Sequence, residues 1–290
     1  MQSHFDSLMN SKKHPMERRD FIKTALALAL AVAAGPSVAK TIRTDTNGLQ
    51  EGEFTLDIAG QPVPVYMAQP KDKGNLPVVV VISEIYGLHE HIADVVRRFA
   101  KLGYLAVAPE LFIRQGEPAD YFTVPDLMKN VVSKVPDEQV ISDLDAIVEW
   151  AKRNGGDQEK IAVAGFGWGG RFAWLYAAHN PKIKAAVAWY GRLVPEGAPT
   201  ALSPTNPIDI AANLTVPVLG LYGAKDPGIS AASIQKMKDG LATGSSLSEF
   251  YIYPKAGNSF YADYRATFMP DEAKDSWKRC LDWLHAHGVE

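Results

Sequence analysis

An unbroken run of apolar, mostly β-branched residues at Pro77–Ile82 most limits the folds open to this 290-residue chain. Such a run is typical of a strand buried on both faces, because a strand with one exposed face alternates apolar and polar residues. Buried strands that alternate with helices predict an α/β fold with a doubly wound, mostly parallel sheet. Further strands are predicted at 104–108, 160–164, 183–190, 216–222 and 250–253, and helices at 92–102, 137–153, 169–179, 229–241 and 271–287.

Two shorter segments with alternating apolar and polar residues, 54–58 and 63–68, flank Gly60-Gln61-Pro62 and predict an N-terminal antiparallel hairpin. Residues 40–52 are polar and are predicted to form a linker. Residues 111–137 predict loop and short helix, and 191–213 a long loop. The sequence shows no internal repeat and no change in amino-acid composition along residues 53–290. These residues are therefore predicted to form a single domain.

The first 39 residues have the layout of an export signal: basic residues, the wholly apolar run Ala25–Ala34, and Ser37-Val38-Ala39 as a cleavage site. The run is shorter than the roughly 20 residues that span a membrane as a helix. Glu17-Arg18-Arg19-Asp20-Phe21-Ile22-Lys23 resembles a twin-arginine signal. An ordinary signal peptide or an uncleaved anchor is the alternative. We expect the twin-arginine export machinery as a partner, cleavage near Ala39, and a periplasmic mature chain that does not insert into the membrane.

The chain has a single cysteine, Cys280, which excludes an internal disulfide and any zinc site built on several thiolates. A disulfide-free chain is consistent with folding in a reducing cytosol before export. Cys280 lies in the apolar pattern of the last predicted helix and is expected in the core. His89 and His91 are spaced as a possible metal pair, but without an apparent third ligand a pocket or capping role is favoured. The net charge of −3 does not indicate a nucleic-acid-binding protein, which would carry an excess of basic residues.

The most specific motif is the glycine-rich turn Ala164-Gly165-Phe166-Gly167-Trp168-Gly169-Gly170, between a predicted strand and a predicted helix. The nucleophile elbow of α/β-hydrolases places its nucleophile at the centre of such a turn, between glycine-sized neighbours. A dinucleotide-binding loop has similar glycine spacing, but the strand that follows ends in Trp189-Tyr190-Gly191 instead of an acidic residue. The elbow is therefore the favoured interpretation, although Gly167 at its centre carries no nucleophile.

Over most of 53–286 the sequence resembles the dienelactone hydrolase family, the carboxymethylenebutenolidase-like α/β-hydrolases. The resemblance rests on the turn at 165–170 together with Ser83-Glu84-Ile85-Tyr86-Gly87, Pro109-Glu110-Leu111-Phe112, Trp189-Tyr190-Gly191, Gly223-Ala224-Lys225-Asp226 and Tyr253-Pro254 followed by Ala256-Gly257-Asn258-Ser259-Phe260. It implies an α/β-hydrolase fold with a cysteine, an aspartate and a histidine as catalytic triad. These positions fall on Gly167, Asp226 and Asn258, so the aspartate is present and the other two members are replaced.

The resemblance also implies an oxyanion hole at the backbone N–H groups of Ile85 and Trp168, which the loss of side chains leaves intact. Glu84 matches the glutamate that partners the family's resting thiol. Without a thiol, we expect Glu84 to act as a base toward a water above Gly167. The alternative for Glu84 is an exposed loop carboxylate.

Arg114 and Arg265 match arginines that hold a substrate carboxylate in the family, with surface salt bridges as the alternative. Arg265 is offset from the family's position. Tyr190 is expected to line the pocket and Trp168 to cover it, and for both ordinary core packing is the alternative. No cofactor and no metal are implied.

Three interpretations of function remain open at this point. The first is a hydrolase of carboxylic ester or enol-lactone bonds, with little turnover because Asn258 cannot be protonated near pH 7. The second is a catalytically degenerate periplasmic protein that binds a small carboxylate. The third is an inactivated variant of a working enzyme, since Cys→Gly and His→Asn each need a single base change.

Overall fold

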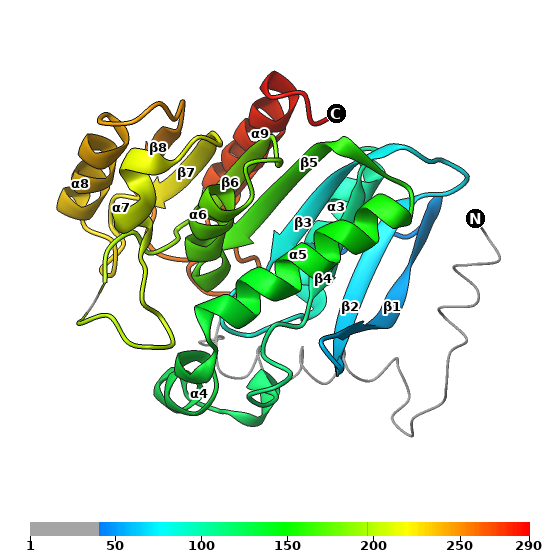
Figure 1. The fold of residues 1–290 in the computed structure, drawn as a ribbon, viewed down its shortest axis with the longest axis horizontal. Coiled ribbons are helices and arrows are strands. Elements are labelled where there is room, and N and C mark those ends of the chain that lie inside the picture. Colours follow the sequence, from blue (N-terminus) through cyan, green and yellow to red (C-terminus); the bar gives the residue numbers. More distant parts are fainter. Residues whose placement is uncertain (1–40, 196) are drawn as a thin grey trace.

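The computed structural model describes residues 41–195 and 197–290, which form one mixed sheet between two layers of helices (Figure 1). The sheet of this part of the chain has eight strands in the order β1-β2-β4-β3-β5-β6-β7-β8. The strands are β1 (Leu49–Ile58), β2 (Gln61–Pro70), β3 (Leu76–Ile82), β4 (Leu105–Pro109), β5 (Gly156–Phe166), β6 (Ala185–Trp189), β7 (Val218–Gly223) and β8 (Glu249–Tyr253). β1–β2 and β2–β4 pair antiparallel, and all the other pairs are parallel.

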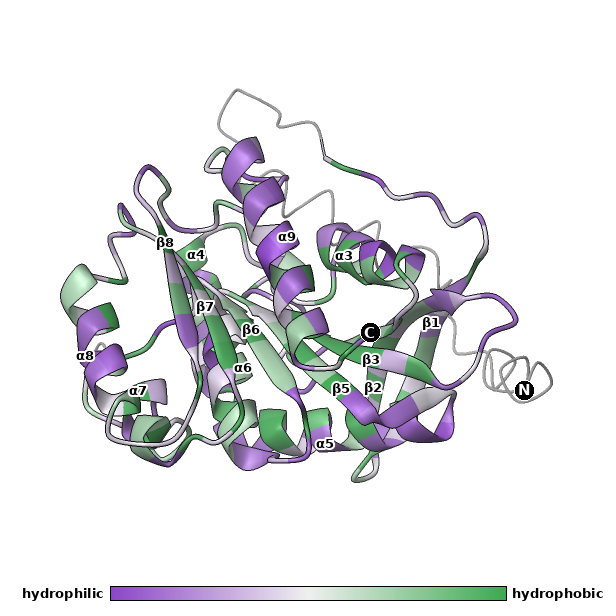
Figure 2. Ribbon diagram, turned by 90° about the horizontal axis from the view of Figure 1, so that it is seen from above, coloured by the Kyte–Doolittle hydropathy of each residue, from purple (hydrophilic) through white to green (hydrophobic). Residues whose placement is uncertain are grey.

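Helices cover both faces of the sheet, as the doubly wound prediction requires. α3 (Glu90–Lys101) and α9 (Pro270–Ala286) lie on one face, and α5 (Asp137–Arg153) and α6 (Trp168–His179) lie on the other (Figure 2). The remaining helical elements are α4 (Val124–Asn130), α7 (Pro207–Ile210), α8 (Ala231–Leu241) and the 3-10 turns Pro118–Asp120, Val132–Lys134 and Ala211–Asn213.

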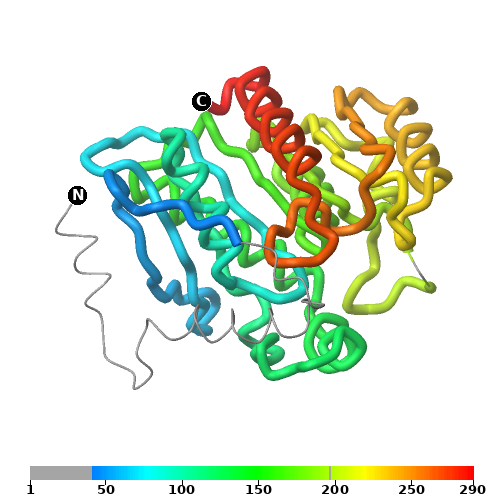
Figure 3. Tube along the Cα trace, turned by 180° about the vertical axis from the view of Figure 1, so that it is seen from behind, coloured from blue at the N-terminus to red at the C-terminus, as the bar shows by residue number. Residues whose placement is uncertain are grey.

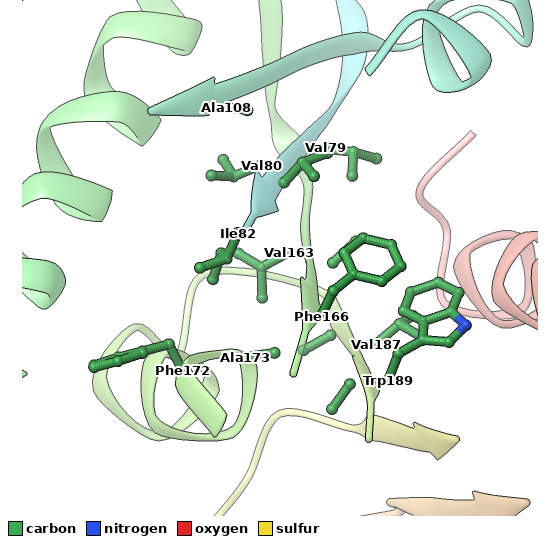
Figure 4. Close-up of a cluster of buried hydrophobic side chains, with 14 of the residues drawn as sticks. Val79, Val80, Ile82, Ala108, Val163, Phe166, Phe172, Ala173, Val187 and Trp189 are labelled. Atoms are coloured by element: carbon green, nitrogen blue, oxygen red, sulfur yellow. The ribbon is translucent and has the colours of Figure 1, made fainter. Parts of the chain in front are cut away.

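The hydrophobic core lies where the central strands meet these helices (Figure 4). β3 and β5 bury Val79, Val80 and Val163 completely, and α6 adds Phe172. At about 25 cal/mol per Å² of apolar surface, this burial holds the helices on the sheet, and the parallel pairing of β3 to β7 places the carboxyl ends of these strands at one edge. Figure 4 also shows Phe166 and Trp189 side by side at the ends of β5 and β6, where their rings stack at 4.6 Å.

The predicted fold class is confirmed, and two predicted segments are corrected. β1 begins at Leu49, so the last four residues of the predicted linker 40–52 belong to the sheet. β1 begins this early because it pairs with β2 along its whole length, from Leu49 opposite Pro70 to Ile58 opposite Gln61. Leu49 is also buried. The polar residues between Leu49 and Phe54 are half-buried, which hides the strand from an apolar pattern. The predicted loop 191–213 also contains a short helix, α7, which begins after an Asn206–Asp209 capping box.

The predicted export signal 1–39 lies outside the described residues. Within 41–195 and 197–290, no helix is both long and apolar enough to cross a membrane.

Candidate active site

The glycine turn between β5 and α6 has the backbone of a nucleophile elbow. Gly167 has φ 53° and ψ −112°, in the positive-φ range that residues with a side chain rarely adopt. Its N–H donates to Trp189 O at 2.9 Å. A Cβ on Gly169 would lie 2.3 Å from Ile82 O, so this position is restricted to glycine. A Cβ on Gly167 would meet nothing nearer than Glu84 Cγ at 3.7 Å, so the elbow has room for a side chain that the sequence omits.

Asp226 and Asn258 meet as the predicted frame requires. Asp226 follows β7, and its Oδ2 accepts a hydrogen bond from Asn258 Nδ2 at 2.8 Å. The other carboxylate oxygen accepts from the N–H of Gly228 at 2.8 Å. Asn258 Oδ1 in turn accepts from Ser259 Oγ at 2.7 Å. Asn258 is thus held at both ends of its amide, and an amide cannot relay a proton as an imidazole does.

The two predicted oxyanion-hole residues, Ile85 and Trp168, lie on neighbouring segments. The N–H of Gly169 donates to Ser83 O at 3.1 Å, which fastens the start of α6 to the segment after β3. Trp168 is the first residue of α6, where a backbone N–H has no acceptor within its own helix. The partial positive charge of the helix N-terminus favours a developing anion there.

Glu84 is buried, which excludes the exposed loop carboxylate that the sequence left open. Its Oε2 accepts from Tyr264 Oη at 2.5 Å and lies 3.9 Å from Arg265 Nη1. Burial and the adjacent Glu84 carboxylate raise the pKa of Tyr190 and of Tyr264 well above the usual range of a phenol. Both phenols therefore stay protonated. In the described part of the chain, Glu84 Oε1 and Tyr190 Oη are buried without a hydrogen-bond partner.

Tyr190, predicted to line the pocket, lies next to the elbow. It follows β6, and its ring atoms Cδ2 and Cε2 would both lie 3.9 Å from a Cβ on Gly167. Its backbone has φ 39°, a strained conformation for a residue with a side chain. Trp168, in contrast, packs its ring against Phe112 at 4.7 Å and Phe172 at 4.5 Å, which favours the packing alternative for that side chain.

The two predicted carboxylate-binding arginines lie in different surroundings. Arg265 is at the site, where Nη1 donates to Ser259 Oγ at 2.5 Å and Nη2 to Tyr86 Oη at 3.2 Å. Arg114 forms a two-pronged ion pair with Asp143 of α5, at 2.6 and 2.9 Å. This is the salt-bridge alternative, although its Asp143 end is buried and not at the surface. We therefore assign Arg114 to the scaffold.

His89 and His91 are buried and do not converge on a common point. Their ring centroids are 6.1 Å apart, and His91 Nδ1 bonds to Asp263 Oδ1 at 2.9 Å. Burial lowers the pKa of His89 to about 3, so its ring is neutral. Among the described residues, no group of three or more His, Cys, Asp and Glu side chains could hold a metal. Cys280 is buried in α9, and burial raises the pKa of its thiol, as expected for a core position.

Three site residues were missed by sequence reasoning: Ser259, Asp263 and Tyr264. All lie in the turn-rich stretch between β8 and α9, where no periodicity fixes the direction of a side chain. The dense polar and aromatic run Tyr261-Ala262-Asp263-Tyr264-Arg265 was the available signal. Polar residues that interrupt a long loop close to a triad position are worth including among candidates.

Comparison with known proteins identifies the family of the chain. Residues 63–288 match the dienelactone hydrolase family. The chain belongs to that family. It is 49% identical over 276 residues to a protein named “Putative carboxymethylenebutenolidase” from Methylorubrum extorquens, a match that covers 94% of each chain. A protein of the same name from Yersinia pestis is 51% identical over 245 residues, covering 84% of this chain and 91% of its own.

A solved structure of the family has the same fold. The crystal structure named “Putative Dienelactone Hydrolase” from Klebsiella pneumoniae subsp. pneumoniae MGH 78578 is 50% identical, with a TM-score of 0.80. The match covers 82% of this chain and 98% of that one. The family membership and the α/β-hydrolase fold predicted from the sequence are thus confirmed, and the chain is a dienelactone-hydrolase-family hydrolase by descent.

Proposed function

We propose that this site binds small carboxylic esters or enol lactones and hydrolyses them slowly, by direct attack of water and without a covalent acyl-enzyme. The observation that carries the proposal is the elbow at Gly167. It keeps the strained backbone and the neighbouring oxyanion segment of a hydrolase, but it offers an open Cβ position in place of a nucleophile. A covalent route requires a nucleophile at this position.

In this mechanism the substrate carbonyl oxygen points toward the N–H groups of Ile85 and Trp168. Glu84 accepts a proton from a water above Gly167, and the water oxygen bonds to the carbonyl carbon. The tetrahedral oxyanion is stabilised by the two N–H groups. The bond to the leaving oxygen then breaks, and that oxygen takes the proton from Glu84, so that ester and water become acid and alcohol.

The expected rate is low for two physical reasons. Tyr264 and Arg265 both lie against Oε2 of Glu84, which leaves only Oε1 without a partner in the described residues to accept a proton from water. The route also lacks the activated nucleophile, so it retains what the oxyanion hole and binding supply, about 10³–10⁴ over water. A general base adds up to about 10²–10⁴ when it is well placed.

A second candidate is a binding protein for a small carboxylate, without turnover. It is favoured by a series of hydrogen bonds that links Asp226, Asn258, Ser259 and Arg265. This series ends on the Arg265 cation, and none of its side chains transfers a proton near pH 7 as a histidine would. A positive guanidinium at the end of the series suits a carboxylate ligand.

One set of measurements separates the two candidates. Hydrolysis of an aryl ester and of an enol lactone is measured for the natural chain and for Glu84→Gln, and binding of the lactone and of its acid product is measured by calorimetry. Glu138→Gln, which changes an exposed carboxylate at the start of α5, is the matched control. The hydrolase proposal expects a loss of at least about tenfold in Glu84→Gln alone. If Glu84→Gln hydrolyses the substrates as fast as Glu138→Gln, the hydrolase proposal is wrong. Binding of the acid product without turnover favours the second candidate.

We also propose that the chain is exported to the periplasm by the twin-arginine machinery. The support is the sequence of residues 1–39, with Arg18-Arg19 ahead of the apolar run Ala25–Ala34.

A further inference from the structure

The segment 257–269, called the site loop here, carries Asn258, Tyr264 and Arg265 but has almost no regular secondary structure. Loops without ladder hydrogen bonds need side-chain anchors to hold a geometry that function requires. Figure 3 shows this loop passing between β8 and α9, next to the N-terminal segment that precedes β1. The question is which group fixes it.

Asp263 is the anchor of the site loop. Its side chain is 1% exposed. Oδ1 accepts from His91 Nδ1 at 2.9 Å, and Oδ2 accepts from Arg98 Nη2 at 2.9 Å and from the N–H of Ile42 at 3.2 Å. Although burial alone opposes ionisation, His91 and Arg98 together lower the pKa of Asp263 below its usual range. One carboxylate thus joins the loop to α3 and to the N-terminal segment.

The His91 ring is oriented by this contact. Because a carboxylate only accepts, His91 Nδ1 carries a hydrogen, and Nε2 is left buried without a partner in the described residues. An aspartate that fixes the tautomer of a histidine is the arrangement that also orients a catalytic imidazole. At the triad, by contrast, Asp226 now faces the amide of Asn258.

Tyr264 links this pair to the site. Its ring lies 4.8 Å from that of His89, 5.2 Å from that of His91 and 6.3 Å from that of Tyr86, measured between centroids. Its backbone follows directly on Asp263, and its hydroxyl donates to Glu84 Oε2. The Tyr264 ring therefore packs against the two buried histidines while its hydroxyl reaches Glu84.

We propose that Asp263 and His91 are a positioning pair: by fixing the site loop and the Tyr264 ring, they set the orientation of Glu84 and the hydrogen bond that Glu84 accepts from Tyr264. The hydrogen bonds of Asp263 run to His91, Arg98 and Ile42, so the pair is assigned a positioning role and not a catalytic one. The inference rests on the proposed function in one respect, that Glu84 is the base. The charged and titratable groups facing the pair are Arg98 from α3, His89 from its own segment, and Tyr261 and Tyr264 from the site loop.

A purely structural role for the pair makes a different prediction, so the two can be separated. If Asp263 only stabilises the fold, its replacement lowers the free energy of unfolding and leaves the titration of Glu84 in the folded protein unchanged. If it acts through Tyr264, its replacement weakens the Tyr264–Glu84 hydrogen bond, which favours the protonated form of Glu84.

The test is a titration of the Glu84 side-chain carboxyl by ¹³C NMR in the full chain, which needs no turnover. The variants are Asp263→Asn, Tyr264→Phe and the double variant. Asp145→Asn is the matched control, because Asp145 forms a similar ion pair with His179 at 2.8 Å, but at the surface. We expect the Glu84 midpoint to rise by about 0.5–1 pH unit in Asp263→Asn and in Tyr264→Phe, with no further rise in the double variant.

An unchanged midpoint in Asp263→Asn, or additive shifts in the double variant, would overturn the inference. Should Asp263→Asn fail to fold, His91→Gln is the second variant, since it keeps the Asp263 contacts to Arg98 and Ile42 and is expected to shift Glu84 in the same direction. Failure of the proposed function gives a distinct result: Glu84 titrates as described, but Glu84→Gln hydrolyses ester as fast as the natural chain.

Discussion

Asp226 and Asn258 are joined by a hydrogen bond of 2.8 Å, at the two positions where the family resemblance predicts an aspartate and a histidine. The contact shows that the loop after β8 still delivers residue 258 to the carboxylate after β7. The sheet and these two loops therefore bring residues 226 and 258 together.

The elbow glycines differ in what they tolerate. Gly169→Ala places a methyl group 2.3 Å from Ile82 O, and we expect a loss of about 3 kcal/mol or more in the free energy of unfolding. Gly167→Ala meets no such contact, but its positive φ costs about 1–2 kcal/mol. Urea unfolding measures both, with Gly197→Ala, which has nothing within 4 Å of its Cβ position, as control. Equal losses at 167 and 169 would contradict the proposed geometry.

Glu110 makes stability depend on pH. Burial raises the pKa of this carboxyl to about 7, although the N–H groups of Leu88 and Phe112 donate to it. The folded state therefore binds a proton that the unfolded state releases near pH 4.5. The stabilisation is complete below about pH 4.5 and is lost as the pH rises through 7, a change of up to about 3 kcal/mol.

Replacing Glu110 with Gln removes this titration. We expect the difference in unfolding free energy between the natural chain and Glu110→Gln to fall by up to about 3 kcal/mol between pH 4.5 and pH 8. Glu138→Gln, at an exposed position, is the control. A difference that stays constant over this pH range would show that Glu110 does not change its protonation between the two states.

Arg114 is expected to matter for stability and not for ligands. Arg114→Met leaves the buried Asp143 without its ion-pair partner, at a cost of about 2–3 kcal/mol. Because the guanidinium is held by Asp143, affinity for a lactone or for its acid should stay within about twofold. Thermal unfolding and calorimetry measure the two effects. A large loss of acid affinity with unchanged stability would return Arg114 to the ligand site.

Export is tested by fractionation of cells that produce the full chain. Replacing Arg18 and Arg19 together with Lys removes the twin-arginine motif but keeps the positive charge. The proposal expects the natural chain in the periplasm and the variant retained in the cytosol. A variant that reaches the periplasm unchanged would favour an ordinary secretory signal.

Much of this fold can be predicted from the sequence. The apolar run Pro77–Ile82 indicates a buried strand, and the periodic apolar residues of Asp137–Arg153 indicate a helix. Regular elements also place the elbow: Gly167 follows β5 and Asp226 follows β7. What stayed hidden depends on tertiary contacts. Leu49 joins β1 through pairing that half-buried polar residues mask, and no local pattern indicates that Asp143 takes up Arg114.

The site loop shows most clearly what cannot be predicted from the sequence. Asp263 and Tyr264 acquire their roles from partners more than 160 positions away in the chain, His91 and Glu84. Sequence spacing cannot foresee such contacts without the fold. The family resemblance supplied Asn258, which falls on a motif position, and suggested Arg265 with an offset, but it supplied nothing for Asp263 and Tyr264.

The central claim is that this chain keeps the frame of a family hydrolase and lacks only the nucleophile and the base. The most direct test is to restore both, with Gly167→Cys and Asn258→His singly and together, and to measure enol-lactone hydrolysis. We predict that the double variant is faster than the natural chain by about 10³-fold or more, with little gain in either single variant. A natural chain that already matches the double variant, or a double variant that folds but stays as slow as the natural chain, would contradict the account.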